Sequence, residues 1–216
     1  MKIYAFSGLG ANKRVFQFLN LKAQLIPVDW IAPKQNETID NYAKRLFEAI
    51  NPEEEFAILG VSFGGLIAME ISKIYKPKLT ILISSAETKH ELPPIYRLFG
   101  KSGVIKFIPK FLLRPPKKMT KWLFGAENSI LLYQIIDDTD LTFAKWAIEK
   151  ITTWKNEYRL ERLYKIHGTN DKMIPIKPDS KTIAIPGGGH FMIVDRATEL
   201  STVINKLIEK NTQPCP

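Results

Sequence analysis

Cysteine is almost absent from this chain of 216 residues, whose single cysteine is Cys215. One cysteine cannot form an internal disulfide, and because no base is near it in sequence, it is typical of a polar tail. Long apolar runs are also missing. No window approaches the ~18 uninterrupted apolar residues of a membrane helix, and residues 1–6 enter a strand-like run without the apolar stretch of a signal peptide. These absences predict a cytoplasmic protein.

The rest of the composition is ordinary for a globular protein, with 45% hydrophobic and 25% charged residues. Disordered and fibrous classes are therefore not indicated. The length suits one core that carries an insertion, because domains cluster near ~100–150 residues. The net charge of +9 predicts non-specific attraction to anions, and where that charge lies matters more for function.

Apolar runs of strand length alternate with helical periodicity along most of the chain. The segments expected to form strands are Lys2–Phe6, Leu25–Val28, Phe56–Val61, Leu79–Ser84, Arg162–Ile166 and Lys181–Ile185. Those expected to form helices are Thr38–Ile50, Gly64–Lys76, Thr139–Trp154 and Thr198–Lys210. Such alternation predicts an α/β fold with a mainly parallel six-stranded sheet flanked by helices. Pro27 cannot donate a ladder hydrogen bond, which places its strand at a sheet edge.

The segment 91–155, which we call the cap segment, breaks this alternation. Prolines punctuate its short apolar stretches, at Pro93, Pro94, Pro109, Pro115 and Pro116. A mostly helical insertion is expected, placed where loops leave the sheet and function concentrates. The predicted organisation is thus a core formed by residues 1–90 and 156–211, the inserted cap segment, and a tail at 212–216.

A candidate nucleophile, Ser62, lies in the run Gly60-Val61-Ser62-Phe63-Gly64 between an expected strand and an expected helix. A nucleophile elbow requires this context, since the sharp turn exposes the serine hydroxyl and strains its backbone. The glycines on each side let the helix pack close to the strand. The helix N-terminus also favours negative charge that develops near the serine. The run and its setting together predict a serine nucleophile.

A serine nucleophile needs a base, and the chain offers three histidines. His190 follows Gly187-Gly188-Gly189 between the last expected strand and the last expected helix, so it should lie on a loop at the carboxyl edge of the sheet. The glycines should let this loop approach Ser62. His167 ends a strand and is expected to be buried and hydrogen-bonded, whereas His90 is expected to be an exposed loop residue. His190 is therefore the candidate base.

An acid must fix the histidine tautomer and stabilise the imidazolium that forms. Asp171 lies in the turn after the strand that holds His167, and the chain order Ser62, Asp171, His190 is one in which such triads occur. Glu87, just beyond another expected strand, is the competing candidate, because a neighbouring strand end can also reach the histidine. The sequence leaves both acids open.

A tetrahedral intermediate requires N–H donors around its oxyanion. Phe63, directly after the nucleophile, is expected to supply one donor from its main chain. Leu9, in the turn Ser7-Gly8-Leu9-Gly10, is expected to supply the other. The alternative for that turn is a tight turn with no ligand. No metal or cofactor is expected in this chemistry.

Four runs resemble the successive signatures of small bacterial α/β-hydrolases: Ser7-Gly8-Leu9-Gly10, Gly60-Val61-Ser62-Phe63-Gly64, His167-Gly168-Thr169-Asn170-Asp171 and Gly189-His190. The resemblance covers 1–85 and 158–210. It implies the α/β-hydrolase fold without its first two strands, a Ser62, Asp171, His190 triad, and oxyanion donors at Leu9 and Phe63. A serine nucleophile argues against haloalkane dehalogenases and epoxide hydrolases, for which the family uses an aspartate.

Between Leu92 and Ala126 the chain has no acidic residue and eight basic ones. They are Arg97, Lys101, Lys106, Lys110, Arg114, Lys117, Lys118 and Lys121. Three interpretations compete: a lid with an apolar underside and solvated lysines, lysines that attract an anionic substrate such as an acyl-CoA, and docking on an anionic membrane surface. Nucleic acid is not expected as a partner, because no reader motif accompanies the charge.

The resemblance thus implies a carboxylic-ester hydrolase that works through an acyl-enzyme on a small, partly apolar acyl substrate, which the second interpretation makes anionic. A thioesterase is the alternative among enzymes, because the same fold hosts esterases, lipases, thioesterases, amidases and C–C bond hydrolases. A ligand-binding relative that keeps the elbow is the alternative outside enzymes.

Overall fold

The sheet contains six strands, all parallel, in the order β2-β1-β3-β4-β5-β6. The computed structural model describes residues 1–48, 50 and 54–212, so the predictions for Cys215 and for residues 213–216 of the tail lie outside the described residues. The strands are β1 (Lys2–Phe6), β2 (Gln24–Pro27), β3 (Phe56–Val61), β4 (Leu79–Ile83), β5 (Leu163–Gly168) and β6 (Thr182–Ile185). The predicted parallel α/β sheet is confirmed.

Strand β2 lies at one edge of the sheet and pairs with β1 alone, with Pro27 opposite Ala5. Proline is compatible with this position because its missing N–H faces away from the ladder. The next residue, Val28, donates its N–H to the Ala5 carbonyl at 2.9 Å. The edge position predicted from Pro27 is therefore confirmed.

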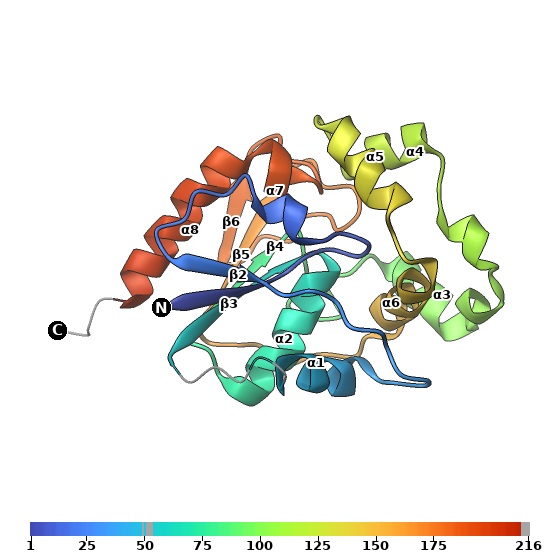
Figure 1. Ribbon diagram of the computed structural model, residues 1–216, viewed down its shortest axis with the longest axis horizontal. Helices are drawn as coiled ribbons and strands as arrows, with labels where there is room; N and C mark the ends of the chain where they lie inside the picture. Colours follow the sequence, from blue (N-terminus) through green and yellow to red (C-terminus); the bar gives the residue numbers. More distant parts are fainter. Residues whose placement is uncertain (49, 51–53, 213–216) are drawn as a thin grey trace.

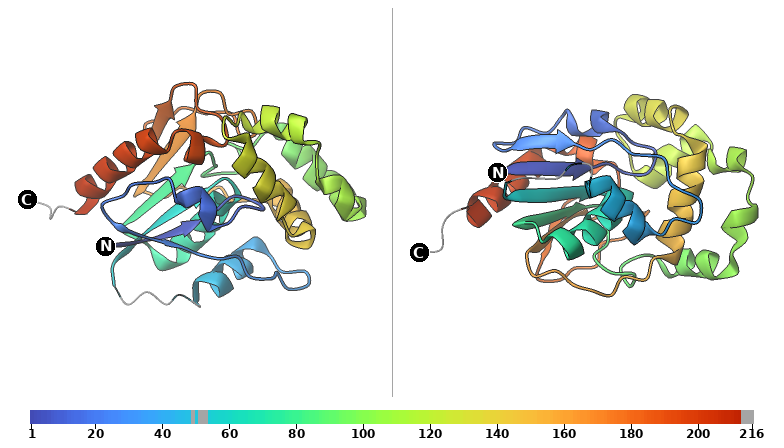
Figure 2. Two further views of the ribbon diagram at one scale, coloured as in Figure 1. Left: turned by 45° about the horizontal axis from the view of Figure 1, so that its top comes forward. Right: turned by 60° about the horizontal axis from the view of Figure 1, so that its bottom comes forward.

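Helices cover both faces of the sheet (Figure 1, Figure 2). Helices α1 (Ile39–Glu48) and α2 (Phe63–Tyr75) pack on one face, and α7 (Met192–Asp195), α8 (Ala197–Thr212) and the 3-10 helix η1 (Lys13–Phe16) pack on the other. The side chains of β1 alternate between the two layers: Ile3 and Ala5 join the α8 core, whereas Tyr4 and Phe6 join the α2 core. A sheet buried on both faces explains the near-continuous apolar strands of the sequence.

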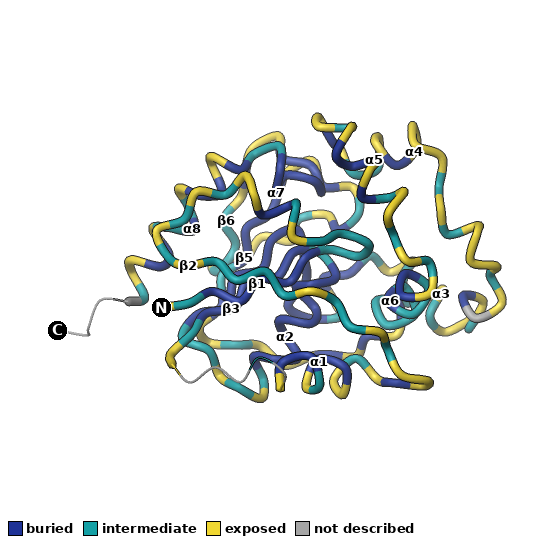
Figure 3. Tube along the Cα trace, viewed as in Figure 1, coloured by how far each residue is buried: buried dark blue, intermediate teal, exposed yellow. Residues whose placement is uncertain are grey.

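The cap segment contains α3 (Pro94–Ser102), η2 (Val104–Phe107), η3 (Lys110–Leu113), α4 (Lys117–Phe124), α5 (Ser129–Asp137) and α6 (Leu141–Thr153). Prolines precede or begin several of these helices, and Gly103 and Gly125 end α3 and α4 with φ values of 65° and 60°. All six elements lie beyond the carboxyl ends of the strands (Figure 1). Exposed residues are frequent along these elements, whereas most buried residues lie in the sheet and in the helices packed on it (Figure 3).

Two of the differences between the predicted and the observed helices have local reasons. The helix expected from Thr139 begins at Leu141, because Asp140 caps it by accepting a hydrogen bond of 2.7 Å from the Thr142 N–H. Helix α7 was not predicted, since its four residues are too few to show a helical period. No helix in the described part of the chain has both the length and the apolar character needed to cross a membrane.

Candidate active site

Ser62 occupies a strained turn between β3 and α2. Its φ of 51° and ψ of −120° lie outside the regions that L-residues favour, at a cost of about 1–3 kcal/mol. The turn is held from two sides, since the Ser62 N–H donates to the Ile83 carbonyl at 3.0 Å and the Ser62 carbonyl accepts the Ser85 hydroxyl at 2.6 Å. The strain is therefore fixed by neighbouring structure and directs the serine side chain away from the sheet core.

The glycines around Ser62 are required by close backbone contacts. A Cβ at Gly60 would lie 2.5 Å from the Gly64 carbonyl oxygen, and one at Gly64 would lie 2.2 Å from the Phe6 carbonyl oxygen. A Cβ at Gly65 would lie 2.1 Å from the Ser85 hydroxyl. These distances leave no room for a methyl group, so the run can form the turn only with glycine at these places.

Two consecutive hydrogen bonds join Ser62, His190 and Asp171, the three candidate catalytic residues of the sequence. The Ser62 hydroxyl lies 2.8 Å from Nε2 of His190, and Nδ1 of the same ring lies 2.8 Å from Oδ2 of Asp171. With its proton on Nδ1, the neutral ring donates to the carboxylate and leaves Nε2 free to accept from the serine. The arrangement can pass a proton from the serine to the imidazole while the carboxylate stabilises the resulting cation.

Asp171 is buried and fully hydrogen-bonded. Its Oδ1 accepts the Met173 and Ile174 N–H groups, each at 2.9 Å, and His167 Nε2 lies 3.4 Å from its Oδ2. Burial alone would raise the pKa of this carboxyl. The electrostatic interaction with His190 and the hydrogen bonds from both histidines and from the Ile174 N–H outweigh burial and hold the pKa well below its usual range. Asp171 is therefore ionised at neutral pH.

The loop that carries His190 packs against both the core and the cap segment. A Cβ at Gly188 would lie 3.2 Å from the Gly168 Cα, and one at Gly189 would lie 2.8 Å from the Phe124 and Gly125 carbonyl oxygens. The Phe124 ring also stands edge-on to the imidazole, with ring centroids 5.4 Å apart. Close packing against β5 and the end of α4 thus requires these glycines. The sequence predicted only that they let the loop approach Ser62.

The turn after β1 lies against the serine. A Cβ at Gly8 would lie 3.4 Å from the Ser62 Cβ, and both Gly8 and Leu9 line the same cavity as Ser62. The Ser7 hydroxyl donates to the Ala11 carbonyl at 2.8 Å, which closes the turn. Phe63 is the first residue of α2, so its N–H has no partner within the helix. Both expected oxyanion donors thus belong to segments that adjoin Ser62.

The other candidates from the sequence lie apart from this chain of hydrogen bonds. Glu87 is fully buried and its carboxylate accepts from Arg159 at 3.0 Å and from the Leu160 N–H at 2.9 Å. His167 is buried, as expected, and its Nε2 lies 2.5 Å from the Ile174 carbonyl. His90 is exposed, as expected, and lies 3.5 Å from Glu157.

A cavity of about 440 Å³ lies between the strand ends and the cap segment, with Ser62 and His190 in its wall. Most of its lining is apolar and comes from the cap segment, including Phe99, Leu123, Leu132, Ala144 and Ile148. Arg114 is the one lining residue with a permanent charge among those that the structure describes. The cavity therefore suits an apolar group placed next to the serine.

Three residues near the site were not predicted from the sequence. Ser85 supports the Ser62 turn, Phe124 contacts the His190 ring, and Tyr96 lines the cavity while its hydroxyl donates to the Met173 carbonyl at 2.8 Å. Ser85 could have been suspected from its place directly after a strand beside β3. Phe124 and Tyr96 carried no signal, because aromatic residues are common throughout the cap segment.

No family model and no curated protein matches the sequence. Solved structures do match. A candidate lipase from Acinetobacter baumannii superposes with a TM-score of 0.72 at 17% identity, over 97% of this chain and 84% of that one. A bromoperoxidase from Bacillus anthracis gives 0.71 at 16% identity, over 96% and 90%.

A thioesterase from the prodiginine biosynthetic pathway in Streptomyces coelicolor also matches, with a TM-score of 0.71 at 14% identity, over 96% of this chain and 90% of that one. Likeness at such identities establishes a shared fold. These three proteins are named for different activities, so the shared fold does not identify the reaction of this chain, and only the residues of its site can indicate it.

Proposed function

We propose that this protein is a serine hydrolase that cleaves carboxylic esters through an acyl-enzyme. Its α/β-hydrolase fold is compatible with that reaction. The observation that carries the proposal is the unbroken chain of hydrogen bonds from the Ser62 hydroxyl through His190 to Asp171. The three groups come from the ends of three different strands, and a merely structural role does not require them to meet beside a cavity. The lipase and thioesterase names of the matching structures agree with a hydrolase.

In the first half of the proposed reaction, Oγ of Ser62 attacks the carbonyl carbon of the ester. The hydroxyl proton moves to Nε2 of His190, and the electron pair of the carbonyl double bond moves to its oxygen. Collapse of this tetrahedral intermediate breaks the bond to the alcohol, which leaves with the proton from Nε2. The acyl group remains on Ser62.

In the second half, water takes the place of the alcohol. His190 accepts a proton from the water as its oxygen attacks the acyl carbon, and the second tetrahedral intermediate collapses to release the acid. Oγ of Ser62 recovers the proton from Nε2. Asp171 keeps its charge throughout, because its pKa lies well below the usual carboxyl range, and so it stabilises the imidazolium in both halves.

We assign the oxyanion donors to the main-chain N–H groups of Leu9 and Phe63. Phe63 offers the first N–H of α2, where the helix dipole adds a favourable field for negative charge. Leu9 lies in the turn that Gly8 brings against the Ser62 side chain. Removing one such donor from a hydrolase typically costs about 100- to 1,000-fold in kcat.

The apolar lining of the cavity favours a substrate whose acyl or alcohol part is apolar, with the cap segment as a lid over it. A thioester would fit the same cavity and the same reaction sequence, so thioesterase activity is the second candidate. A binding protein without catalysis is disfavoured, because it gains nothing from a buried carboxylate aimed at a histidine that is itself aimed at a serine.

The proposal is tested with a panel of neutral esters, acyl-CoAs and amides of varied chain length, run against wild type and Ser62→Ala. Ester turnover by wild type and none by Ser62→Ala supports the proposal. Higher kcat/KM for acyl-CoAs than for esters would reassign the protein to the thioesterases. Turnover that Ser62→Ala retains would refute the role of Ser62.

A further inference from the structure

The outer side of the cap segment exposes most of the large apolar side chains that the structure leaves in solvent. Fourteen such side chains are exposed among the described residues, and nine of them lie between residues 95 and 122. The six that are more than half exposed are Leu98, Phe107, Phe111, Leu112, Met119 and Trp122, which we call the outer cap face. Soluble monomers rarely leave a large apolar patch uncovered, so this face is expected to have an occupant.

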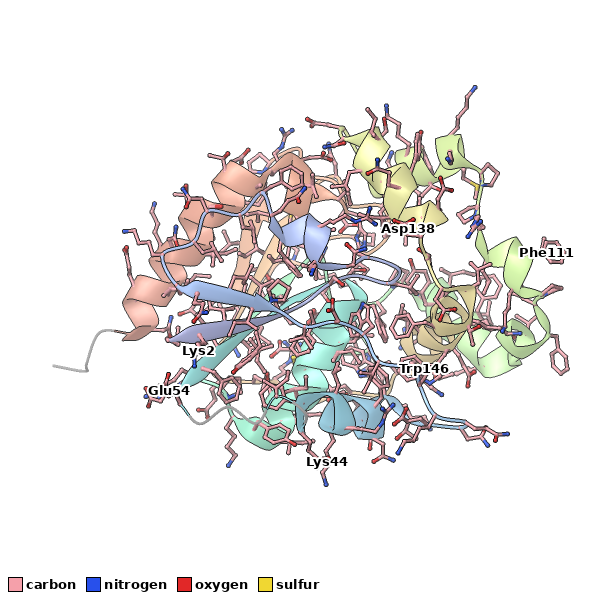
Figure 4. The ribbon with its side chains drawn as sticks, in the orientation of Figure 1. Lys2, Lys44, Glu54, Phe111, Asp138 and Trp146 are labelled. Carbon is pink, nitrogen blue, oxygen red and sulfur yellow. The ribbon has the colours of Figure 1, made fainter. Side chains whose placement is uncertain are left out.

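The exposure follows from the local structure. Elements η2 and η3 are single turns of helix that bury only part of their apolar side chains: Ile105 is buried, whereas Phe107 and Phe111 are 85% and 71% exposed. The stick view shows Phe111 at the outer border of the molecule, pointing away from the sheet (Figure 4). The cavity is lined by other residues of the same stretch, such as Ile105, Ile108 and Leu113. The cap segment therefore has two apolar surfaces, one that lines the cavity and the outer cap face, which is exposed to solvent.

Basic residues lie close in sequence to these side chains. The stretch 92–126 contains no acidic residue, and Lys101, Lys118 and Lys121 are all exposed. Within the described part of the chain, no carboxylate lies within 4.0 Å of any of the three. Lys117 differs, because it pairs with Asp137 at 2.7 Å. The outer cap face thus combines uncovered apolar side chains with uncompensated positive charge.

We propose that the outer cap face docks on the surface of an anionic lipid bilayer. Leu, Met and aromatic side chains can enter the boundary between headgroups and acyl chains, while lysines around them reach the phosphates. Each lysine near an anionic bilayer strengthens binding about fivefold. The charge complementarity selects a phospholipid surface over a neutral protein, and the bulky aliphatic side chains select it over a nucleic acid.

The same stretch also walls the cavity, since Phe99 is half exposed and Arg114 is exposed while both line it. A bilayer seated on the outer cap face would therefore adjoin the cavity that holds Ser62. If the proposed function is correct, an amphiphilic acyl substrate can reach the serine from the bilayer. This last step rests on the proposed function, whereas docking itself does not.

The test uses the full chain with Ser62→Ala, so that lipid is not consumed, and measures cosedimentation with phosphatidylcholine vesicles that either contain or lack phosphatidylglycerol. Binding is expected to the vesicles with phosphatidylglycerol, weaker binding to those without it, and a loss of affinity as salt rises. Absence of binding to the anionic vesicles, or equal binding to both kinds, would overturn the proposal.

Two sets of substitutions separate the apolar and the ionic parts. Phe107→Ser with Phe111→Ser should weaken vesicle binding about tenfold for each ring removed, whereas Ile74→Ser with Tyr158→Ser, exposed elsewhere, should not. Lys101→Gln, Lys118→Gln and Lys121→Gln together should weaken it about 100-fold. The matched control changes three exposed lysines outside the cap segment, Lys13→Gln, Lys34→Gln and Lys206→Gln.

Equal effects of the test and control sets would overturn the assignment of the face. A second copy of the chain is the other occupant to consider. If the Ser62→Ala protein is a dimer that does not bind vesicles, and Phe107→Ser with Phe111→Ser makes it a monomer, the face is a dimer interface and the docking proposal is wrong. The same substitutions are also made in the protein that keeps Ser62, and the turnover of a soluble ester by these variants is measured separately. A failure of docking is thereby distinguished from a failure of hydrolysis.

Discussion

The carboxylate of Glu87 accepts a hydrogen bond of 3.0 Å from Nη1 of Arg159. Its other oxygen accepts the Leu160 N–H at 2.9 Å, and its main-chain carbonyl accepts Asn156 at 2.7 Å. Glu87 therefore ties the end of β4 to the chain that enters β5. Asp171 instead bonds to His190 at 2.8 Å. The two acids that the sequence offers thus have different neighbours, which predicts different consequences when each is neutralised.

Asp171→Asn should lower kcat/KM about 1,000- to 10,000-fold, because the amide cannot hold the required His190 tautomer or stabilise its cation. Glu87→Gln should leave kcat/KM of the folded protein within a few-fold and lower the unfolding temperature, because Arg159 loses its buried partner. Steady-state kinetics and thermal unfolding of both variants measure this. A larger kinetic loss in Glu87→Gln than in Asp171→Asn would transfer the role of the acid to Glu87.

Substitution of Gly64 tests the close contact behind the Ser62 turn. Gly64→Ala should destabilise the protein by about 3 kcal/mol or more, because its methyl group would meet the backbone carbonyl of Phe6, which cannot move aside. The matched control is Gly103→Ala, where φ is 65° but nothing lies within 4 Å of the added carbon. It should cost only about 1–2 kcal/mol for the left-handed backbone.

Urea unfolding of both glycine variants measures these costs. Since the Gly103 site lies at the end of α3, its variant should also keep ester turnover. Equal destabilisation by the two substitutions would show that backbone conformation, and not the contact with β1, determines the need for glycine at position 64.

The ionised carboxylate of Asp171 should contribute stability that depends on pH. Its pKa in the folded protein is below the ordinary value, so its contribution is present above the unfolded carboxyl pKa and is lost as the pH falls through the lower folded value. The difference in unfolding free energy between wild type and Asp171→Asn should therefore shrink as the pH is lowered from neutral into the strongly acidic range. Urea unfolding at a series of pH values measures it. A difference that grows toward acid would contradict the stated direction of the pKa shift.

The cavity predicts a dependence on acyl length that one side chain can change. Ala144 on α6 is buried and lines the cavity, so Ala144→Leu should narrow it. The kcat/KM for long-chain esters should fall about 10- to 100-fold, whereas that for an acetyl ester, which serves as the internal control, should change far less. Equal losses for both esters would mean that the substitution disturbs the catalytic groups and that the acyl chain lies elsewhere.

Most of the core fold could be predicted from the sequence because local and tertiary signals agree there. The strands β1 and β3 have the predicted bounds, and the other four differ by one or two residues at one or both ends. Buried parallel strands are continuous apolar runs, and Pro27 marks the edge strand through its missing N–H. The order of the triad residues and the elbow glycines predicted that Ser62, Asp171 and His190 lie together, and hydrogen bonds of 2.8 Å join them in the structure.

The cap segment was less predictable. Prolines precede α3, η3 and α4, and glycines end α3 and α4, so the elements from α3 to α5 are too short for a helical period to separate them. The sequence also could not tell which apolar residues face the cavity and which face solvent. Phe99 and Phe107 look alike in the sequence, yet Phe99 lines the cavity and Phe107 is 85% exposed. That choice is made by packing between elements distant in sequence.

The proposed reaction requires Ser62 to be a nucleophile that His190 activates. A fluorophosphonate probe with mass-spectrometric mapping of the modified peptide tests it most directly, with wild type, Ser62→Ala, His190→Ala and Ser85→Ala compared. A single adduct is expected on Ser62 in wild type and in Ser85→Ala, none in Ser62→Ala, and labelling slowed by orders of magnitude in His190→Ala. Equal labelling of wild type and Ser62→Ala, or an adduct on another residue, would contradict it.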